Sequence, residues 1–409
     1  MLIVQKFGGS SVADSERIFN VAGRIIEAYD KGKNNIIVVL SAQGDTTDDL
    51  IKKAAQINPK ASKREMDMLL STGEQQSVAL MAMAIQSLGY PAVSLNAMQT
   101  GIDSSTTYGN AKIKTISRGR IEHELSVGNI VLITGFQGVN KFDDITTLGR
   151  GGSDTTAVAV AALLHADICE IYTDVNGIYT ADPKIVPDAK KLDEISYDEM
   201  LELASLGAKV LHNRSVELAK KYNVRLTVRS SLTKEEGTVV KEESKVEKML
   251  VSGVASDKDV SRITVVGVDD MPGRAFKLFS ALSREKVSVD IILQSLGREN
   301  KKDISFTVSK EDLAHALEVL EENKELLGAT DVLHDDNIAK VSVVGAGMAT
   351  NPGVASLMFE ALFDAGINIS MISTSEIKIS VLINSEHADQ AVKAIHDKFM
   401  AATASLRKG

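Results

Sequence analysis

The 409-residue sequence is poor in the features that mark secreted, membrane-bound and zinc-binding proteins. Its one cysteine, Cys169, excludes disulfide bonds within the chain and four-cysteine zinc sites. The longest apolar run, residues 157–164, is far too short to span a bilayer. The N-terminus passes straight into a predicted strand without a basic segment before an apolar core, so we expect no signal peptide. These absences predict a reduced, cytoplasmic protein with no membrane partner.

Positively charged residues are also fewer than negatively charged ones. The sequence has 55 Asp and Glu against 46 Lys and Arg, which gives a net charge of −9. This balance argues against nucleic-acid binding through bulk charge. With 44% hydrophobic and 25% charged residues, the composition is otherwise ordinary for a globular protein. The length fits about two to four domains.

Up to about residue 233, short apolar runs alternate with helical patterns. Strands are predicted at residues 2–4, 36–40, 92–95, 130–134, 169–173 and 225–229. Helices are predicted at residues 14–29, 47–56, 66–88, 155–165 and 214–222, and a capping box at Ser196 and Glu199 predicts a further short helix. This alternation indicates an α/β fold with a mainly parallel sheet and helices on both faces. Residues 234–248 are mostly charged, which favours a solvated linker or an edge strand.

The last third of the chain repeats itself. One unit begins at Arg262 with RITVVGVDDMPGRAFKLFSALSREKVSVDIIL, and the other begins at Lys340 with KVSVVGAGMATNPGVASLMFEALFDAGINISMI. Each reads as strand, Pro-Gly loop, helix and strand, followed by a further strand and helix. This order is typical of the ferredoxin-like βαββαβ unit. We therefore expect domains at residues 1–248, 249–335 and 336–409. The stretch VVGAGMAT lacks the third glycine of a dinucleotide fingerprint, so no nicotinamide site is expected.

Six polar, glycine-rich stretches interrupt the N-terminal part. They are KFGGSS, SAQGDTTDD, STGEQQ, GFQG, TLGRGGSDTTAVAVAALL and YTDVNGIYTADPK. Since strand ends of a parallel sheet converge on one crevice, we expect these stretches to meet there. Phosphoryl transfer depends on positioning and on neutralising charge, and Lys6, the glycine N–H groups and the helix start at Ser153 and Asp154 supply both. The sequence contains neither GxxxxGK[ST] nor an H-R-D loop, so it is neither a P-loop enzyme nor a protein kinase.

Glu74 and Arg150 are the most informative charged pair. A bidentate arginine suits a carboxylate, and a glutamate suits an ammonium group. Together they indicate a zwitterionic amino-acid substrate. The alternative is an internal Arg–Glu bridge or two solvated charges.

In order and spacing, KFGGSSV, SAQGDTTD, STGE, GFQG, LGRGGSDTTA and TDVNGIYTADP resemble the motifs of the aspartate kinase family. The resemblance covers essentially the whole chain, because the two C-terminal repeats resemble ACT domains. It implies an amino-acid-kinase fold followed by an ACT pair. It also implies transfer of the γ-phosphoryl group of MgATP to the side-chain carboxylate of L-aspartate, giving 4-phospho-L-aspartate. That step opens the route to lysine, threonine, methionine and diaminopimelate.

The same resemblance implies roles for individual residues. The catalytic pair would be Lys6, which stabilises the transferring group, and Asp154, which organises the lysine. The implied ATP-binding residues are Lys6, Phe7, Gly8, Gly9, Ser10, Thr173, Asp174, Tyr179, Asp182 and Lys184. The implied aspartate-binding residues are Ser41, Thr47, Glu74, Arg150, Gly151, Gly152 and Ser153. Mg²⁺ would arrive with the nucleotide, and no further metal site is expected. Because the acceptor is already a carboxylate, no general base is needed, and we interpret His212 as structural.

ACT pairs resemble amino-acid sensors, so the resemblance implies feedback inhibition by lysine, alone or together with threonine. The implied effector residues are Met271, Gly273, Ala275, Asp290, Gln294, Asn351, Gly353, Val354, Asn368 and Ile369. A homo-oligomer formed through the ACT domains is also implied, with or without a separate regulatory subunit. The alternative for these residues is a purely structural dimer interface.

The sequence departs from the family pattern at Gln43, Asn176 and Asn213, where methionine, aspartate and proline are frequent. None of these changes removes a proposed catalytic group. Two other functions stay open: a related kinase acting on glutamate, acetylglutamate or carbamate, and a non-catalytic amino-acid sensor. The ACT pair and the Glu74–Arg150 set argue against the first. The retained Lys6, Arg150 and Asp154 argue against the second.

Overall fold

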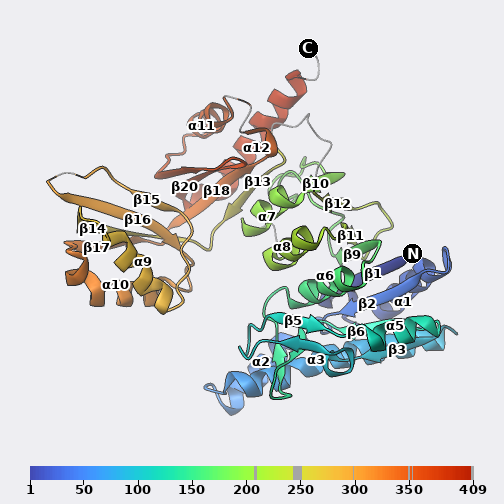
Figure 1. Cartoon of the computed structure of the whole chain (residues 1–409). Helices are drawn as coiled ribbons and strands as arrows, with labels where there is room; N and C mark the ends of the chain where they lie inside the picture. The colour runs from blue at the N-terminus through green and yellow to red at the C-terminus, as the bar shows by residue number, and fades with distance from the viewer. Residues whose placement is uncertain (207–209, 243–250, 298, 349–350, 352, 407–409) are drawn as a thin grey trace. The chain divides into compact units, whose positions relative to one another are not determined.

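The structure is a computed structural model that describes residues 1–206, 210–242, 251–297, 299–348, 351 and 353–406 (Figure 1). The chain divides into two compact units. Unit 1 comprises Met1–Tyr179 and Lys190–Glu247, and unit 2 comprises Thr180–Ala189 and Lys248–Gly409. The predicted domain boundary between residues 248 and 249 lies outside the described residues. The predicted boundary between residues 335 and 336 stays a prediction.

Unit 1 is built on an eight-stranded sheet in the order β10-β12-β11-β9-β1-β2-β6-β3. Its strands are β1 Leu2–Phe7, β2 Asn35–Leu40, β3 Ala92–Leu95, β6 Ile130–Thr134, β9 Ile168–Thr173, β10 Glu194–Ser196, β11 Leu226–Ser230 and β12 Thr238–Lys241. The strand pairs are parallel except β11 with β12, so the predicted mainly parallel sheet is confirmed. Strand β12 falls in the stretch predicted as a linker or an edge strand. That prediction is wrong for these four residues, because β12 is paired on both sides.

Most helices of unit 1 lie close to their predicted positions, whereas those at residues 97–100 and 119–126 were not predicted. They are α1 Ser15–Asp30, α2 Thr46–Ile57, α3 Lys63–Ser87, α4 Ala97–Thr100, α5 Gly119–Ser126, α6 Gly152–Leu164, α7 Tyr197–Ser205 and α8 Asn213–Tyr222, with a 3-10 turn η1 at Gly9–Val12. The capping box of Ser196 and Glu199 begins α7, as the sequence predicts. The short helix α4, which the sequence analysis did not predict, begins with a capping box of its own at Asn96 and Gln99.

Alternate residues of the central strands face opposite layers of helices. Phe7 and Leu40 pack in one buried cluster with Ile25 of α1 and Met81 of α3. Lys6 precedes Phe7 on β1, so its side chain leaves the opposite face of the sheet. There α6 lies against β1, β2 and β9. The period of the strand therefore directs Lys6 towards α6 and Phe7 into the core.

A second, small sheet in unit 1 has the order β5-β4-β7-β8. Its strands are β4 Ile102–Ser104, β5 Ile113–Ile116, β7 Gln137–Val139 and β8 Ile145–Thr147. The sequence did not predict it, because its strands IDS, IKTI, QGV and ITT are short and contain no continuous apolar run. Helix α3 packs against β8. The sheet therefore lies beside the helix that carries Glu74.

The first repeat of unit 2 has the predicted βαββαβ order. Its elements are β14 Ser261–Asp269, α9 Arg274–Arg284, β15 Ile292–Gln294, β16 Lys301–Val308, α10 Leu313–Leu327 and β17 Asp331–Asp335. The strands form an antiparallel sheet in the order β15-β16-β14-β17. A core that includes Leu278, Leu282 and Phe306 joins the helices to the sheet.

The second repeat takes one strand from elsewhere in the chain. Its own elements are β18 Ile338–Val344, η2 Ala346–Met348, α11 Val354–Asp364, β19 Met371–Thr374, β20 Lys378–Asn384, η3 Ser385–His387 and α12 Ala388–Leu406. The sheet order is β13-β18-β20-β19, and β13 is Gly253–Asp257. The fourth strand therefore precedes the first repeat in the sequence. The first repeat is inserted within the second.

Unit 2 also contains a segment from the N-terminal half of the sequence, Thr180–Ala189. Ala181 and Val186 are buried in one cluster with Val254 of β13 and Met358 of α11. The N–H of Val254 donates to the carbonyl oxygen of Thr180 at 2.8 Å. This segment therefore belongs to the core of the second repeat.

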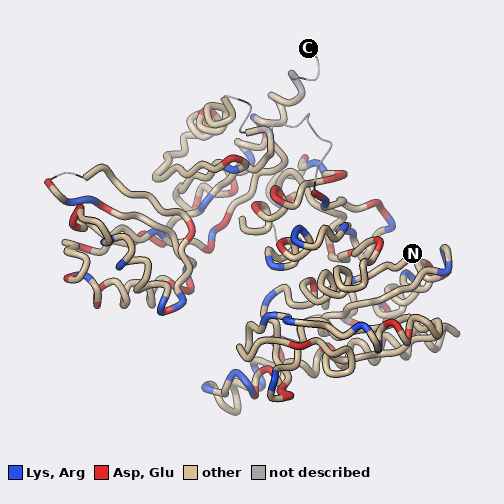
Figure 2. The backbone as a smooth tube through the Cα atoms, in the orientation of Figure 1, with Lys and Arg blue, Asp and Glu red and all other residues tan. Residues whose placement is uncertain are grey.

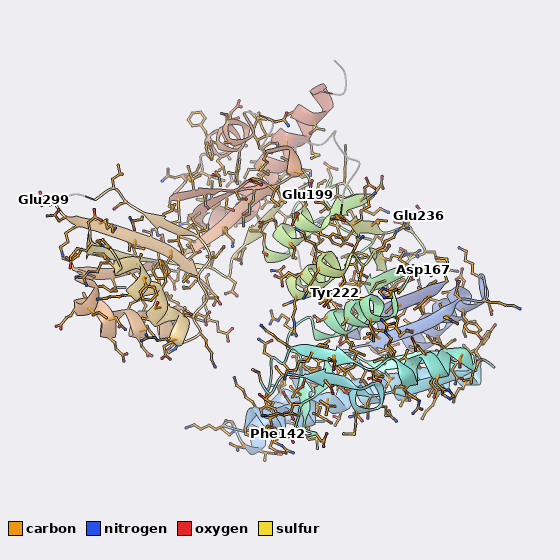
Figure 3. All side chains as sticks on the ribbon, in the orientation of Figure 1. Phe142, Asp167, Glu199, Tyr222, Glu236 and Glu299 are labelled. Carbon is orange, nitrogen blue, oxygen red and sulfur yellow. The ribbon has the colours of Figure 1, made fainter. Side chains whose placement is uncertain are left out.

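Charged residues of both signs are interspersed along both units (Figure 2). Side chains cover the outer faces of the elements, and the labelled Phe142 and Tyr222 lie at the surface of unit 1, with 64% and 54% exposure (Figure 3). Within the described residues, no helix has the length and apolar composition needed to cross a bilayer.

Candidate active site

An ion pair lies where β1 meets α6. Lys6 Nζ is 2.7 Å from Asp154 Oδ1, and the two side chains are 12% and 11% exposed. Asp154 is in the first turn of α6, where the helix dipole favours a negative charge. The ion pair holds the lysine ammonium in place. Because both side chains keep some exposure, an anionic ligand can still reach it.

The loops after β1 and β2 lie against each other. A Cβ on Gly9 would come within 2.5 Å of the carbonyl oxygen of Ala42. The N–H of Gly44 donates to the carbonyl oxygen of Gly9 at 3.0 Å. A Cβ on Gly8 would lie 3.6 Å from Lys6 Nζ, so the glycine leaves room beside the ammonium. The structure thus brings the KFGGSS and SAQG stretches together around the lysine.

The loop after β2 is also fixed by Gln43, one of the positions that departs from the family pattern. Gln43 Nε2 donates to the carbonyl oxygen of Val12 at 2.9 Å. The N–H of Ser41 donates to the carbonyl oxygen of Phe7 at 3.2 Å. Ser41 and Thr47 are both half-buried. Gln43 therefore anchors this loop to η1.

Glu74 is buried on α3 with an incomplete set of partners. Its side chain is 3% exposed overall, and Oε1 accepts from the N–H of Ala42 at 3.1 Å. Oε2 has no hydrogen-bond partner among the described residues. Burial raises the pKa of Glu74 to about 7. A buried carboxylate oxygen without a donor is suited to receive one from a ligand.

Arg150 lies in an exposed loop between Gly149 and Gly151, which have φ of 78° and 69°. A Cβ on Gly151 would meet His212 Cβ at 2.3 Å, so the loop packs closely on the start of α8. The orphaned Oε2 of Glu74 shows that the predicted alternative, an internal bridge to Arg150, does not form. Arg150 itself is exposed.

The GFQG stretch supports the same loop. A Cβ on Gly135 would come within 2.4 Å of Ser153 Oγ, and a Cβ on Gly152 would meet the Phe136 ring at 2.9 Å. Gln137 Nε2 donates to the carbonyl oxygen of Ser71 on α3 at 2.6 Å. Glycines here are required by close packing between GFQG and the residues after Arg150.

His212 has the structural role expected for it. It is the N-cap of α8, and its Nδ1 accepts from the N–H of Arg214 at 3.4 Å. Burial lowers the pKa of His212, although the carboxylate of Asp154 opposes this shift. The neighbouring Asn213 donates to Ser205 Oγ at 2.8 Å.

The residues predicted to bind nucleotide are divided between the units. Thr173, Asp174 and Tyr179 follow β9 in unit 1, whereas Asp182 and Lys184 are exposed residues of unit 2. Phe7 is fully buried and stacks on Tyr172 with ring centroids 4.4 Å apart. The ring of Phe7 therefore belongs to the core.

Asn176, one of the positions that departs from the family pattern, lies two residues after Asp174 and stabilises the loop after β9. Asn176 Oδ1 accepts from Thr233 Oγ1 at 2.8 Å, and its Nδ2 donates to Glu235 at 3.1 Å. The amide therefore joins the loop after β9 to residues 233 and 235.

The predicted effector residues lie in the two repeats. Gly273 and Gly353 are the N-caps of α9 and α11 with φ of 89° and 107°, and a Cβ on either would meet no atom within 4 Å. Asp290 Oδ2 is 2.6 Å from Lys340 Nζ, so Lys340 already pairs with this carboxylate. The remaining predicted residues are exposed or half-buried, namely Met271, Ala275, Gln294, Asn351, Asn368 and Ile369, apart from the buried Val354.

Two charged residues near Arg150, one buried and one half-buried, were not predicted from the sequence. Asp67 on α3 is 1% exposed and accepts hydrogen bonds from Gly109 and Thr147. Arg214 on α8 donates to the carbonyl oxygens of Leu148 and Ala111. Asp67 lies seven residues before Glu74, which places both on one face of α3.

Comparisons with known proteins agree with this architecture. Residues 1–230 match the amino acid kinase family, and residues 263–323 and 341–399 match the ACT domain. The aspartokinase of Mycolicibacterium smegmatis is 53% identical over 404 residues, which cover 97% of this chain and 96% of that protein. These matches confirm the predicted fold class.

Two solved structures of one enzyme are also similar. E. coli aspartokinase III in complex with aspartate and ADP (R-state) has a TM-score of 0.84 at 26% identity, covering 97% of this chain and 99% of that chain. The same enzyme in complex with lysine and aspartate (T-state) has a TM-score of 0.72 at 25% identity, with the same coverage of both chains.

Proposed function

The chain belongs to the aspartokinase family, and we propose that it transfers the γ-phosphoryl group of ATP to the side-chain carboxylate of L-aspartate. The product is 4-phospho-L-aspartate. The observation that carries this proposal is the Lys6–Asp154 pair beside two glycine loops, with the incompletely paired Glu74 close by on α3 and also bonded to the second loop. Positive charge for phosphates and a buried acceptor for an ammonium group thus occur in the same unit.

In this proposal Lys6 neutralises charge that develops on the transferring phosphoryl group. Asp154 orients the lysine ammonium at 2.7 Å. The N–H groups of Gly8, Gly9 and Ser10 would hold the phosphates. The acceptor carboxylate is itself the nucleophile, so no side chain has to remove a proton. Thr173, Asp174, Tyr179, Asp182 and Lys184 stay the proposed lining of the nucleotide pocket.

Recognition of aspartate rests on opposite charges. The α-ammonium would bind Glu74 Oε2, which has no donor from the described residues. Arg150 would bind a carboxylate through its planar fork. Ser41, Thr47 and the backbone of Gly151, Gly152 and Ser153 complete the proposed set.

Mg²⁺ is proposed to bind with the nucleotide. Magnesium sites at phosphates use one or two protein carboxylates and keep several waters. Asp154, beside Lys6, fits this requirement as a carboxylate facing the phosphate side. The ion would supply charge neutralisation on the phosphate oxygens.

The ACT repeats are proposed to make the enzyme sensitive to lysine, alone or with threonine. This regulation would suit the first step of lysine, threonine, methionine and diaminopimelate biosynthesis. The E. coli relative was solved with lysine and aspartate, which supports an amino-acid effector here. Exposed Ile292, Leu293 and Leu296 along β15 and just beyond it support a homo-oligomer formed through the repeats. A separate regulatory subunit stays a further proposal.

The test measures ATP turnover with L-aspartate and Mg²⁺, with acyl phosphate trapped by hydroxylamine. The Lys6→Met variant should lose about 10²–10³-fold in kcat, because it removes a donor to the transferring group. The matched control is Lys52→Met, which removes an exposed lysine of α2 whose side chain is 72% exposed. Turnover with glutamate or acetylglutamate but not aspartate would replace this proposal with the alternative kinase. Lysine binding without any turnover would leave a sensor.

A further inference from the structure

Helix α3 presents a row of polar groups that bond to segments of unit 1 outside the helix. Arg64, Asp67, Ser71 and Glu74 are spaced by three, four and three residues, so they share one face of the helix. Arg64 binds Asp144, Asp67 binds the backbone of Thr147, the carbonyl of Ser71 accepts from Gln137, and Glu74 accepts from Ala42. The row ends at the residue proposed to bind the substrate ammonium.

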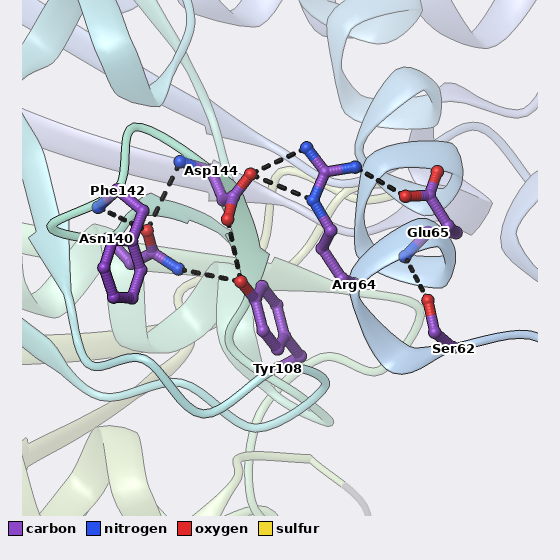
Figure 4. A network of polar contacts seen from close by, with 7 residues as sticks. All are labelled: Ser62, Arg64, Glu65, Tyr108, Asn140, Phe142 and Asp144. Atoms are coloured by element: carbon purple, nitrogen blue, oxygen red, sulfur yellow. Dashed lines mark hydrogen bonds and ion pairs between the residues drawn. The ribbon is translucent and has the colours of Figure 1, made fainter.

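The outer part of this row is a half-exposed network (Figure 4). Arg64 Nε and one terminal nitrogen lie 3.0 and 2.7 Å from Asp144 Oδ1, and Tyr108 OH donates to Asp144 Oδ2 at 2.8 Å. Asn140 Nδ2 donates to Tyr108 OH at 3.4 Å. This network ties the loop before Gly109 and the turn before β8 to the N-terminus of α3.

One turn further along α3, Asp67 makes the same link from a buried position. Oδ2 accepts from the N–H groups of Gly109 and Thr147, both at 2.9 Å. Oδ1 accepts from Thr147 Oγ1 at 2.7 Å and from the N–H of Gly109 at 3.1 Å. Both oxygens are therefore occupied by loop donors, and the side chain is 1% exposed. Asp67 cannot also serve as a ligand, so its role is to hold these loops.

The loops held by Asp67 lead directly to Arg150. Thr147 ends β8 three residues before Arg150. A Cβ on Gly149 would lie 3.1 Å from Asn110 Oδ1 and 3.2 Å from the carbonyl oxygen of Gly109. The loop at residues 109–110 therefore supports the residue next to Arg150.

Arg214 on α8 binds the same two segments. Its two terminal nitrogens donate to the carbonyl oxygens of Leu148 and Ala111, each at 2.8 Å. The N–H of Ala111 donates to the carbonyl oxygen of Thr147 at 2.9 Å. The segments 109–111 and 147–149 are thus bound to each other, to α3 through Asp67 and to α8 through Arg214.

We propose that Asp67 and Arg214 are positioning residues for Arg150 and set the affinity of the enzyme for the carboxylate of its amino-acid substrate. Glycines on both sides of Arg150 give its backbone little rigidity of its own. The anchors at Thr147, Leu148 and Ala111 supply that rigidity. This inference rests on the proposed binding of aspartate by Arg150.

The test compares steady-state constants of the full-length enzyme. Asp67→Ala should raise KM for aspartate by about 10- to 100-fold, since a misplacement of about 1 Å can cost that much. KM for ATP should change by less than about twofold, because Lys6 and its glycine loops make no contact with Asp67. Asp67→Asn should restore most of the affinity. Its amide oxygen still accepts from both N–H groups, and its nitrogen can donate to Thr147 Oγ1.

Glu124→Ala is the matched control for loss of a buried carboxylate. Glu124 is 8% exposed on α5 and accepts from Arg120 and Asn129, each at 2.7 Å. The Glu124→Ala variant should lower Tm as Asp67→Ala does and leave KM for aspartate unchanged. If Asp67→Ala does not fold, Arg214→Lys replaces it, because a lysine cannot bridge two carbonyl groups with a planar fork.

Arg150→Lys separates this inference from the proposed function. A raised KM for aspartate in Arg150→Lys, with no change in Asp67→Ala or Arg214→Lys, would overturn the positioning role and leave the proposed function intact. An unchanged KM in Arg150→Lys would overturn both, because Arg150 would then not bind aspartate. Equal increases in KM for ATP and for aspartate would show a general loss of structure and also overturn the positioning role.

Discussion

At the scale of single residues, Glu74 holds a carboxylate that the protein only partly satisfies. One oxygen accepts a backbone N–H, and burial raises the pKa of Glu74 from 4.5 to about 7. The folded state therefore binds more protons than the unfolded state between these values, and stability falls as the pH rises through this window. A substrate ammonium at Oε2 would reverse the effect, because an opposite charge favours the ionised form. The ionised form of Glu74 is therefore destabilised without a ligand and would be stabilised by a bound ammonium group.

The affinity for aspartate should consequently depend on pH. Below about pH 7 Glu74 is mostly protonated. The dissociation constant of aspartate should therefore rise about tenfold for each unit by which the pH is lowered. Isothermal titration of aspartate into the enzyme, in buffers of different ionisation enthalpy, should also show proton release near neutral pH. Glu74→Gln should bind weakly with a flat pH profile. A flat profile in the natural enzyme would mean that Glu74 does not meet the ammonium.

The sequence indicated Glu74 and Arg150 because their charges suit a zwitterion and their motifs are glycine-rich. It did not indicate Asp67, although the same helix carries it. An acidic residue in the first half of a helix is usually solvated, and nothing local shows that two loops will cover it. Its donors come from Gly109 and Thr147, 42 and 80 residues away, so only the folded chain reveals the contact.

At the scale of elements, α1 and α3 each contain one interior glycine in a different environment. A Cβ on Gly23 of α1 would meet no atom within 4 Å, whereas a Cβ on Gly73 of α3 would come within 2.7 Å of Ala42 Cβ. Gly73 therefore lets α3 approach the loop after β2 closely enough for Glu74 to bond Ala42.

Alanine at these two positions should have opposite effects. Gly23→Ala should stabilise the protein by about 1 kcal/mol through helix propensity. Gly73→Ala should destabilise it by about 1–3 kcal/mol through overpacking, and it should raise KM for aspartate as the loop shifts. Urea unfolding followed by circular dichroism, together with steady-state kinetics, measures both. Equal stabilisation by the two substitutions would show that the loop moves without cost.

The long, strongly periodic elements were predictable, and the partners of short strands were not. Helices such as α3 and buried runs such as β2 and β6 follow from their pattern of apolar residues. Strand β13 gives no local sign that it pairs with β18, because register with a distant strand is decided by the tertiary fold. The repeat pattern alone therefore divides the C-terminal third into two continuous domains, whereas the chain inserts one repeat within the other.

At the scale of the whole molecule, the motif TDVNGIYTADP spans both units. Its residues through Tyr179 belong to unit 1, and from Thr180 onwards they belong to unit 2. Thr180 is fully buried, and its Oγ1 shares a hydrogen bond with His396 Nε2 of α12 at 2.9 Å. The chain after a proposed nucleotide-binding residue is therefore bonded into the core of the second repeat. A ligand that alters this core can act on the nucleotide side through the chain itself.

We expect Thr180→Val to weaken the proposed feedback inhibition by lysine while sparing catalysis. Valine keeps the shape of threonine but removes the hydrogen bond to His396, at a cost of about 1–3 kcal/mol for the buried group left behind. The lysine concentration for half-inhibition should rise about fivefold or more, with kcat in the absence of lysine nearly unchanged. Ser342→Ala is the control. It removes a buried hydrogen bond between β18 and β20 of the second repeat, from Ser342 to Ser380, and leaves the bond of Thr180 to His396 in place. Equal lysine sensitivity of Thr180→Val and the natural enzyme would show that the hydrogen bond between Thr180 and His396 does not carry the signal.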